Sequence, residues 1–104
     1  MSQFAVFKSP GANPEVLFVV QIQSDRLANA AGRLVMALNS VKASAPPDHP
    51  LTPRLVVQGH SVYANPFNIA TVPSFRLKEA LETLAEIDQD KVIRALDELS
   101  LIHI

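Results

Sequence analysis

Acidic side chains are the residues of this chain most able to do chemistry, and five of them lie close together near its C-terminal end. They are Glu79, Glu82, Glu86, Asp88 and Asp90. The three glutamates have the i, i+3, i+7 spacing that places side chains on one face of a helix. Two such carboxylates can act as general acid and general base. A helix face in contact with solvent has the same pattern and is the favoured interpretation.

A sixth carboxylate, Asp25, follows a strongly apolar run in the sequence Gln23-Ser24-Asp25. It is either a hydrogen-bonded anchor or a catalytic acid, and the anchor is favoured because no base partner is identifiable.

Side chains for nucleophilic or metal chemistry are sparse. The chain has no Cys, which excludes disulfides, thiolate nucleophiles and thiolate metal sites. Its three histidines, His49, His60 and His103, lack ligand spacing, and its three glycines form no phosphate loop. We therefore predict no metal, no cofactor and no catalytic residues, with exposed, structurally neutral histidines.

Length and composition indicate one globular domain over residues 1–104, with 48% apolar residues. The net charge of −1 argues against a general nucleic-acid binder, which needs a basic excess. The N-terminus lacks the pattern of a signal peptide, and no stretch reaches the length of a membrane span. The expected location is the cytoplasm, with no membrane contact.

The elements that must position these residues are mostly strands. Short apolar runs bounded by Gly, Pro and Asn predict six of them. They cover residues 4–7, 16–22, 33–38, 54–58, 61–64 and 69–72, with a turn at Asn65-Pro66 before the last. The run 16–22 is apolar enough for burial on both faces. Because the connections are too short for crossover helices, the sheet should be largely antiparallel.

Three further segments complete the chain. Residues 39–53 hold four of the eight prolines and predict a surface loop, either functional or inert. Residues 75–88 have leucines at helical spacing, and helix and strand both remain open. Asp88 is then the predicted N-cap of a C-terminal helix.

That C-terminal helix, Val92 to Ile104, has two apolar faces. The predicted core face consists of Val92, Ala95, Leu96, Leu99 and Ile102. A second strip contains Ile93, Leu101 and Ile104, together with Asp97. A small domain seldom covers two faces of a terminal helix, so the second strip is buried in a dimer or kept for a partner.

Several segments, in order, resemble the CcdB family of plasmid and chromosomal toxins. They are QFAVF at 3–7, LFVVQIQSD at 17–25, GRLVMAL at 32–38, ATVP at 70–73, and the helix at 92–99. The resemblance implies a mainly β (α+β) fold with a C-terminal helix. It implies an SH3-like barrel of the CcdB/MazF type, an antiparallel sheet with a small accessory sheet, assembled as a homodimer.

The resemblance also implies a function without enzymatic activity. CcdB-type toxins bind the A subunit of DNA gyrase and trap its cleaved complex with DNA, without binding nucleic acid directly. A small CcdA-like antitoxin neutralises them. The positions that match the family's gyrase contacts, or stand in their place, form the predicted target-binding patch. They are Arg26, Leu27, Asp97, Leu101, Ile102 and Ile104.

The tail departs from the family pattern, which ends in Trp-Gly-Ile with the Trp stacked on a gyrase arginine. This chain has no Trp, and Leu101 or Ile102 stands at that position. Two alternatives therefore remain beside the gyrase poison. One is a degenerate family member that binds antitoxin but no longer poisons gyrase. The other, less favoured, is a MazF-like endoribonuclease.

Overall fold

The computed structural model describes residues 3–23 and 32–102, and the side chain of Ile102 is not described. The described elements are β1 (Ala5–Lys8), β2 (Val16–Gln21), β3 (Arg33–Ser40), β4 (Arg54–Val57), β5 (His60–Val72), η2 (Ser74–Arg76), β6 (Glu82–Thr83) and α1 (Glu86–Ile102). No helix within these ranges is long and apolar enough to cross a membrane.

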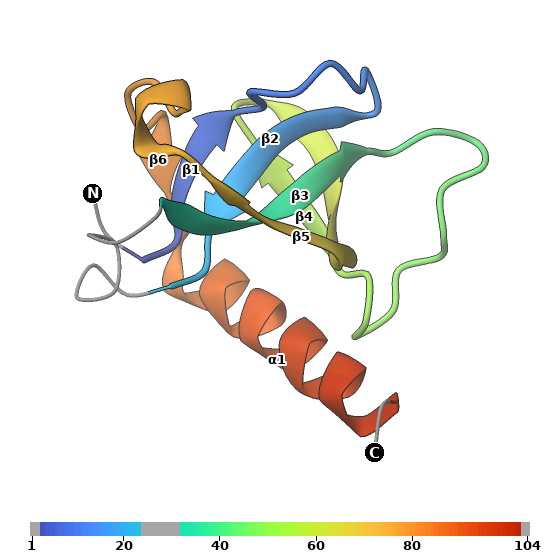
Figure 1. Cartoon of the computed structure of the whole chain (residues 1–104). Helices are drawn as coiled ribbons and strands as arrows, with labels where there is room; N and C mark the ends of the chain where they lie inside the picture. The colour runs from blue at the N-terminus through green and yellow to red at the C-terminus, as the bar shows by residue number, and fades with distance from the viewer. Residues whose placement is uncertain (1–2, 24–31, 103–104) are drawn as a thin grey trace.

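The strands form one curled sheet in the order β4-β5-β3-β2-β1-β6, and every pair is antiparallel (Figure 1). The predicted mainly β fold with a C-terminal helix, of the SH3-like CcdB type, is confirmed. The small accessory sheet is not separate within the described residues. At the other end of the sheet from β6, β4 pairs with the first residues of β5, from His60 to Tyr63, and is part of the same six-stranded sheet.

A turn predicted at Asn65-Pro66 is wrong, because β5 continues through both residues. The register against β3 shifts there: Ala37 lies opposite Asn65, whereas the neighbouring Met36 lies opposite Ile69. The additional residues form a bulge, where a proline costs no ladder hydrogen bond. The Asn65 Oδ1 atom accepts a hydrogen bond from the Phe67 backbone N–H at 3.1 Å. The predicted strands 61–64 and 69–72 are therefore two parts of one bent strand.

A glycine fixes the start of β3 beside the end of β5. Gly32 has a φ of +143°, and a Cβ atom built on it would lie 2.5 Å from the carbonyl oxygen of Val72. No other side chain fits this close backbone approach without displacing β5.

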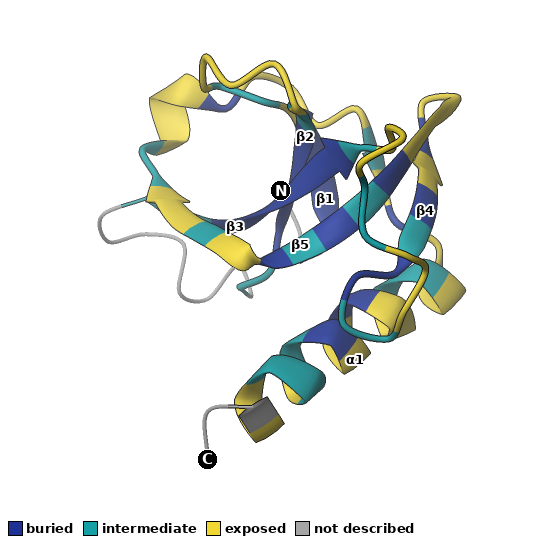
Figure 2. Cartoon of the chain, turned by 90° about the vertical axis from the view of Figure 1, so that its right-hand side faces the viewer, coloured by how far each residue is buried: buried dark blue, intermediate teal, exposed yellow. Residues whose placement is uncertain are grey.

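The sheet is apolar on both faces, and α1 covers only one of them (Figures 1 and 2). The larger cluster lies beneath α1 and includes Val6, Val20, Met36, Val62 and Val92, all fully buried. A smaller cluster on the other face is formed by Ala5, Phe7, Val19, Val35 and Leu77. Alternate residues of β2 enter the two clusters, which confirms burial of this strand on both faces.

The helical spacing in residues 75–88 produces no α-helix before Glu86, where α1 begins; only the short 3-10 helix η2 and the strand β6 lie in this segment. Leu77 is buried in the smaller cluster and Leu84 in the larger one, on opposite faces of the sheet. The segment passes along the edge of β1, where the backbone N–H of Leu81 donates to the Val6 carbonyl at 2.7 Å. Burial against two sheet faces thus overrides the local preference for a helix.

The prediction that the three glutamates of this region lie on one helix face is wrong. Glu79, Glu82 and Glu86 share no helix face, since α1 begins only at Glu86. Glu82 in β6 accepts hydrogen bonds from the backbone N–H and the side-chain amide of Gln58, at 3.1 and 3.0 Å. Asp88 lies in the first turn of α1 and is not its N-cap. It still interacts favourably with the helix dipole there.

The proline-rich segment is a loop, as predicted, and it begins after β3 ends at Ser40. Hydrogen bonds between side chains and nearby backbone carbonyls stabilise this loop. The Thr52 hydroxyl donates to the Pro47 carbonyl at 3.1 Å, and the guanidinium of Arg54 donates to the Pro46 carbonyl at 2.7 Å.

Candidate partner-binding surface

The inner face of α1, which packs on the sheet, carries the predicted core residues. Val92 and Ala95 are fully buried, and Leu96 is half-buried against the same cluster. Leu99 is also half-buried. These four side chains recur at the helical spacing of an apolar stripe. The core face is confirmed for them, while the side chain of Ile102 lies outside the description.

The opposite side of α1 leaves apolar residues in contact with solvent. Ile93 is 44% exposed and Leu101 is 66% exposed, and Asp97 between them is exposed. These three residues follow one another at intervals of four and therefore lie on one face. We call Ile93, Asp97 and Leu101 the outer strip. It is an apolar surface with one carboxylate at its centre, which suits a protein partner better than a reaction.

Polar contacts tie the N-terminal half of α1 to the rest of the fold. The ammonium group of Lys91 donates to the Arg54 carbonyl at 3.2 Å and lies 3.7 Å from the carboxylate of Asp88. The Gln89 side chain donates to the Leu84 carbonyl at 2.8 Å. The C-terminal end of α1 extends beyond the strands in both views (Figures 1 and 2). The outer strip therefore runs from an anchored half of the helix onto a projecting end.

Only part of the predicted target-binding patch falls within the described residues. Asp97 and Leu101 lie together on the outer strip, one helical turn apart. Arg26, Leu27 and Ile104 lie outside the described residues, as do Asp25 and His103. Ile102 is the last residue of α1, and its side chain is not described. The complete patch remains a prediction.

The two described histidines are exposed, as predicted. The His49 Nδ1 atom accepts a hydrogen bond from the Leu51 backbone N–H at 3.0 Å, inside the proline-rich loop. The ring of His60 lies 5.8 Å from the ring of Phe18. Within residues 3–23 and 32–102, no three His, Asp or Glu side chains are grouped so that they could hold a metal ion.

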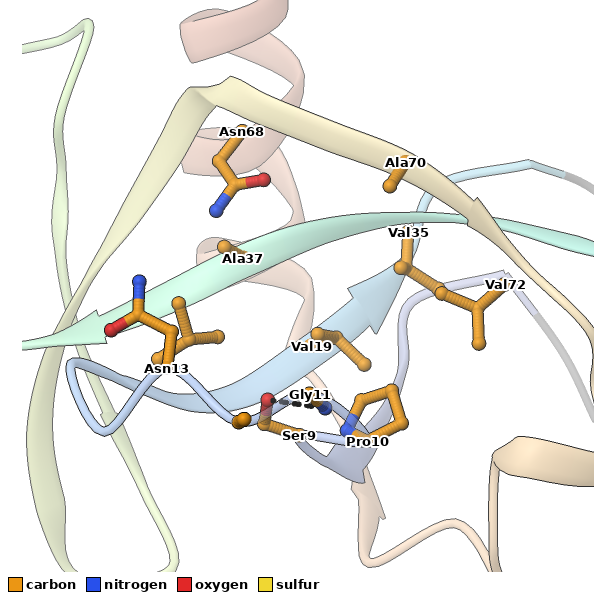
Figure 3. Close-up of a pocket in the computed structure, with 12 residues that line it drawn as sticks. Ser9, Pro10, Gly11, Asn13, Val19, Val35, Ala37, Asn68, Ala70 and Val72 are labelled. Carbon is orange, nitrogen blue, oxygen red and sulfur yellow. Dashed lines mark hydrogen bonds between the residues drawn. The ribbon is translucent and has the colours of Figure 1, made fainter.

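Sequence reasoning missed a hollow on the sheet face opposite α1 (Figure 3). Its volume is about 190 Å³, and its lining includes Val19 and Val35 of the smaller cluster and Ala70 of β5. The only sequence signal was the small size of Ala37 and Ala70, at positions where neighbouring strand residues are larger. The two alanines indicate a hollow only when it is known that β3 and β5 are paired side by side in the sheet.

Comparison with solved structures supports the fold independently. An endoribonuclease in complex with its cognate antitoxin, from a mycobacterial species, aligns with this chain at a TM-score of 0.76 and 16% sequence identity. The alignment covers 97% of this chain and 96% of that one. At this identity the likeness shows a common fold and nothing about activity. No curated protein sequence matches the chain.

The family comparison is more specific. The model of the CcdB protein family matches residues 3–101, which include every described strand and all but the last residue of α1. The matched region contains the segments on which the resemblance rests. The curled antiparallel sheet with one C-terminal helix has the architecture that the resemblance predicts. This protein therefore belongs to the CcdB family.

Proposed function

We propose that this CcdB-family protein is the toxin of a toxin–antitoxin pair and acts by binding a protein target. The observation that carries the proposal is the outer strip of α1, where Ile93 and Leu101 are exposed beside Asp97. An apolar strip on a projecting helix end offers the contact area that a protein interface requires.

The proposed target is the A subunit of DNA gyrase, bound at the patch of Arg26, Leu27, Asp97, Leu101, Ile102 and Ile104. The chain has no Trp to serve as the central contact. Loss of a Trp hot spot typically costs about 2–4 kcal/mol, or roughly 30- to 1,000-fold in affinity. Leu101, 66% exposed, restores part of the apolar contact. We therefore expect gyrase binding weaker than that of a toxin with a tail Trp.

Gyrase supercoiling and DNA cleavage assays with the purified protein test whether gyrase is the target. We expect inhibited supercoiling and trapped, cleaved DNA at micromolar protein. If no cleaved complex accumulates at that concentration, gyrase is not the target.

Two partners complete the proposal. The protein acts as a homodimer, and a small CcdA-like antitoxin binds and neutralises it. The aligned endoribonuclease is a protein with its own cognate antitoxin, which supports a partner of this kind. A small acidic protein encoded by the neighbouring reading frame is the expected antitoxin, and co-purification with it tests the pairing.

The second candidate is an endoribonuclease, because the aligned solved structure is that of an endoribonuclease. The net charge of −1 opposes it, because an RNA groove needs a basic excess. Incubation with single-stranded RNA separates the two: cleavage supports the nuclease and removes the gyrase proposal. A degenerate member would instead bind antitoxin, cleave nothing and cause no growth arrest on expression.

A further inference from the structure

A hollow of about 480 Å³ lies between β4 and the N-terminal half of α1, which Figure 2 shows beside each other. Its lining comes from the loop after β3, from β4, from the start of β5 and from α1, and consists of Val41, Arg54, Leu55, Val56, Ser61, Asp88 and Lys91. Pockets that hold small molecules measure roughly 300–1,000 Å³, and the volume falls in this range. We call this site the β4 hollow.

The apolar part of the β4 hollow is aliphatic and partly uncovered. Leu55 is buried, whereas Val56 is 66% exposed and Val41 is exposed as well. Because β4 is the last strand at its end of the sheet, no further strand of the described chain covers these side chains. Exposed aliphatic side chains beside a hollow favour a ligand with a hydrocarbon part.

The guanidinium of Arg54 has one hydrogen-bonding group without an acceptor. Its Nη2 atom donates to the Pro46 carbonyl at 2.7 Å. Its Nη1 atom is buried and has no hydrogen-bond partner among the described residues. An unpaired buried donor is unfavourable, and such a group commonly marks the place of a water, an ion or a ligand. Since Arg54 lines the β4 hollow, a ligand oxygen seated deep in it would supply the acceptor.

Lys91 brings a second cationic donor to the β4 hollow. Its ammonium group donates to the Arg54 carbonyl at 3.2 Å and lies 3.7 Å from the carboxylate of Asp88. An ammonium group has three N–H donors, so one remains for a ligand.

The β4 hollow has a net charge of +1, because two cations, Arg54 and Lys91, stand against one carboxylate, Asp88. A second carboxylate near Arg54, that of Asp48, accepts a hydrogen bond from the Arg54 backbone N–H at 3.2 Å and does not line the hollow. One uncompensated positive charge is complementary to a ligand with a single negative charge.

Phosphorylated ligands and nucleic acid fit this lining less well. A phosphate monoester carries about −1.5 to −2 charges at neutral pH, which exceeds the charge of the hollow. Single-stranded nucleic acid stacks its bases on aromatic side chains, and none of the described residues that line the hollow is aromatic. A carboxylate on a short hydrocarbon chain matches both parts of the lining.

We propose that the β4 hollow binds a small aliphatic monocarboxylate. The carboxylate lies at Arg54 and Lys91, and the hydrocarbon chain lies against Val41 and Val56. The hydroxyl of Ser61, an exposed residue of the same lining, is a further donor. The β4 hollow shares no residue with the outer strip, so the proposal does not depend on the proposed function.

Isothermal titration calorimetry of the full-length protein with octanoate tests the proposal. We expect a Kd below about 1 mM. Acetate lacks the hydrocarbon chain and 1-octanol lacks the charge, so each should bind at least about tenfold more weakly than octanoate. The two comparisons test the apolar and the cationic part of the hollow separately.

The apolar part is also tested by substitution at an exposed position. Val56→Asp places a carboxylate beside the hydrocarbon chain and should weaken octanoate binding at least about tenfold. The matched control is Ile87→Asp, because Ile87 is 69% exposed and lies outside the lining. Octanoate binding to this control should stay within about twofold of wild type.

The cationic part can be tested without removing a hydrogen bond of the fold. Ser61→Asp adds a second carboxylate to the β4 hollow, while the Ser61 carbonyl still accepts the hydrogen bond from the Val41 N–H. We expect octanoate binding at least about tenfold weaker. The control is Ser74→Asp, at an exposed serine outside the lining, with binding within about twofold of wild type.

Circular dichroism establishes that each variant is folded. The proposal is overturned if octanoate binds no more tightly than 1-octanol, if octyl phosphate binds more tightly than octanoate, or if the control variants lose as much binding. A change of oligomeric state in folded Val56→Asp, seen by light scattering, also overturns it, since β4 is then a contact between copies. None of these measurements uses gyrase or an antitoxin, so failure of the proposed function and failure of the β4 hollow are distinguishable.

Discussion

The inner face and the outer strip of α1 carry similar residues in opposite surroundings. Val92 is fully buried, whereas the next residue, Ile93, is 44% exposed. Both are β-branched and apolar, so residue type does not tell core from contact surface. The position around the helix axis does, because the sheet covers one side of α1 and nothing described covers the other. The inner face should therefore determine stability and the outer strip should determine binding.

The largest expected effect compares the two neighbouring residues directly. Val92→Asp buries an unpaired carboxylate and should lower the free energy of unfolding by about 3 kcal/mol or more. Ile93→Asp should lower it by less than about 1 kcal/mol, because the new charge reaches water. Urea denaturation of both variants measures the difference. Similar losses would mean that the outer strip is also core.

The next comparison enlarges a side chain on each side of α1. Ala95 is fully buried, so Ala95→Leu should overpack the cluster and cost about 1–3 kcal/mol of stability. Asp97→Leu adds a residue of the same size on the exposed side and should change stability by less than about 0.5 kcal/mol. Thermal denaturation distinguishes them. An unstable Asp97→Leu variant would place Asp97 in a structural role.

A gain of binding sharpens the role of the outer strip. Leu101→Trp places an aromatic ring where the family resemblance expects one, and a cation–π contact contributes about 0.5–2 kcal/mol. We expect gyrase trapping at roughly two- to thirtyfold lower protein concentration. The matched control is Ile93→Trp, which places the same aromatic ring at the opposite end of the outer strip from Leu101. Equal gains in both variants would indicate nonspecific apolar adhesion.

The smallest expected effect concerns the ion pair beside the outer strip. Arg94 and Glu98 are 3.8 Å apart at i, i+4 spacing, and the arginine side chain is 67% exposed. Arg94→Ala should cost only about 0.3–0.5 kcal/mol, and high salt should remove the difference. A larger loss, measured by denaturation at low and high salt, would show that this helix face contributes to folding.

Local pattern was sufficient to predict most of the fold. The continuous apolar run of β2 matches its burial on both faces of the sheet, and the spacing of Val92, Ala95 and Leu96 matches the one face of α1 that packs on the sheet. The local sequence pattern was insufficient where tertiary contacts determine the secondary structure. Pro66 reads as a turn but lies in a bulge, because β3 continues to pair beyond it. The leucine spacing in 75–88 left helix and strand open, and the structure places Leu77 and Leu84 on opposite faces of the sheet.

The candidate surfaces differ in the same way. The outer strip was predictable, because a helix converts sequence spacing directly into a common face. The hollow on the sheet face opposite α1 was not, since Val19 and Ala70 lie far apart in the chain and line it together only in the folded protein. Sequence spacing is enough to predict a surface formed by one helix. A surface formed by several strands can be predicted only when the register of the sheet is known.

The central claim is that the C-terminal end of α1 binds the target and is not core. Its most direct test measures gyrase trapping and unfolding for Leu101→Asp/Ile104→Asp beside the wild type. We predict that the wild type traps cleaved DNA and that the double variant does not. The double variant should keep its oligomeric state and a free energy of unfolding within about 1 kcal/mol of wild type. A double variant that unfolds, or one that still traps cleaved DNA, would contradict the account.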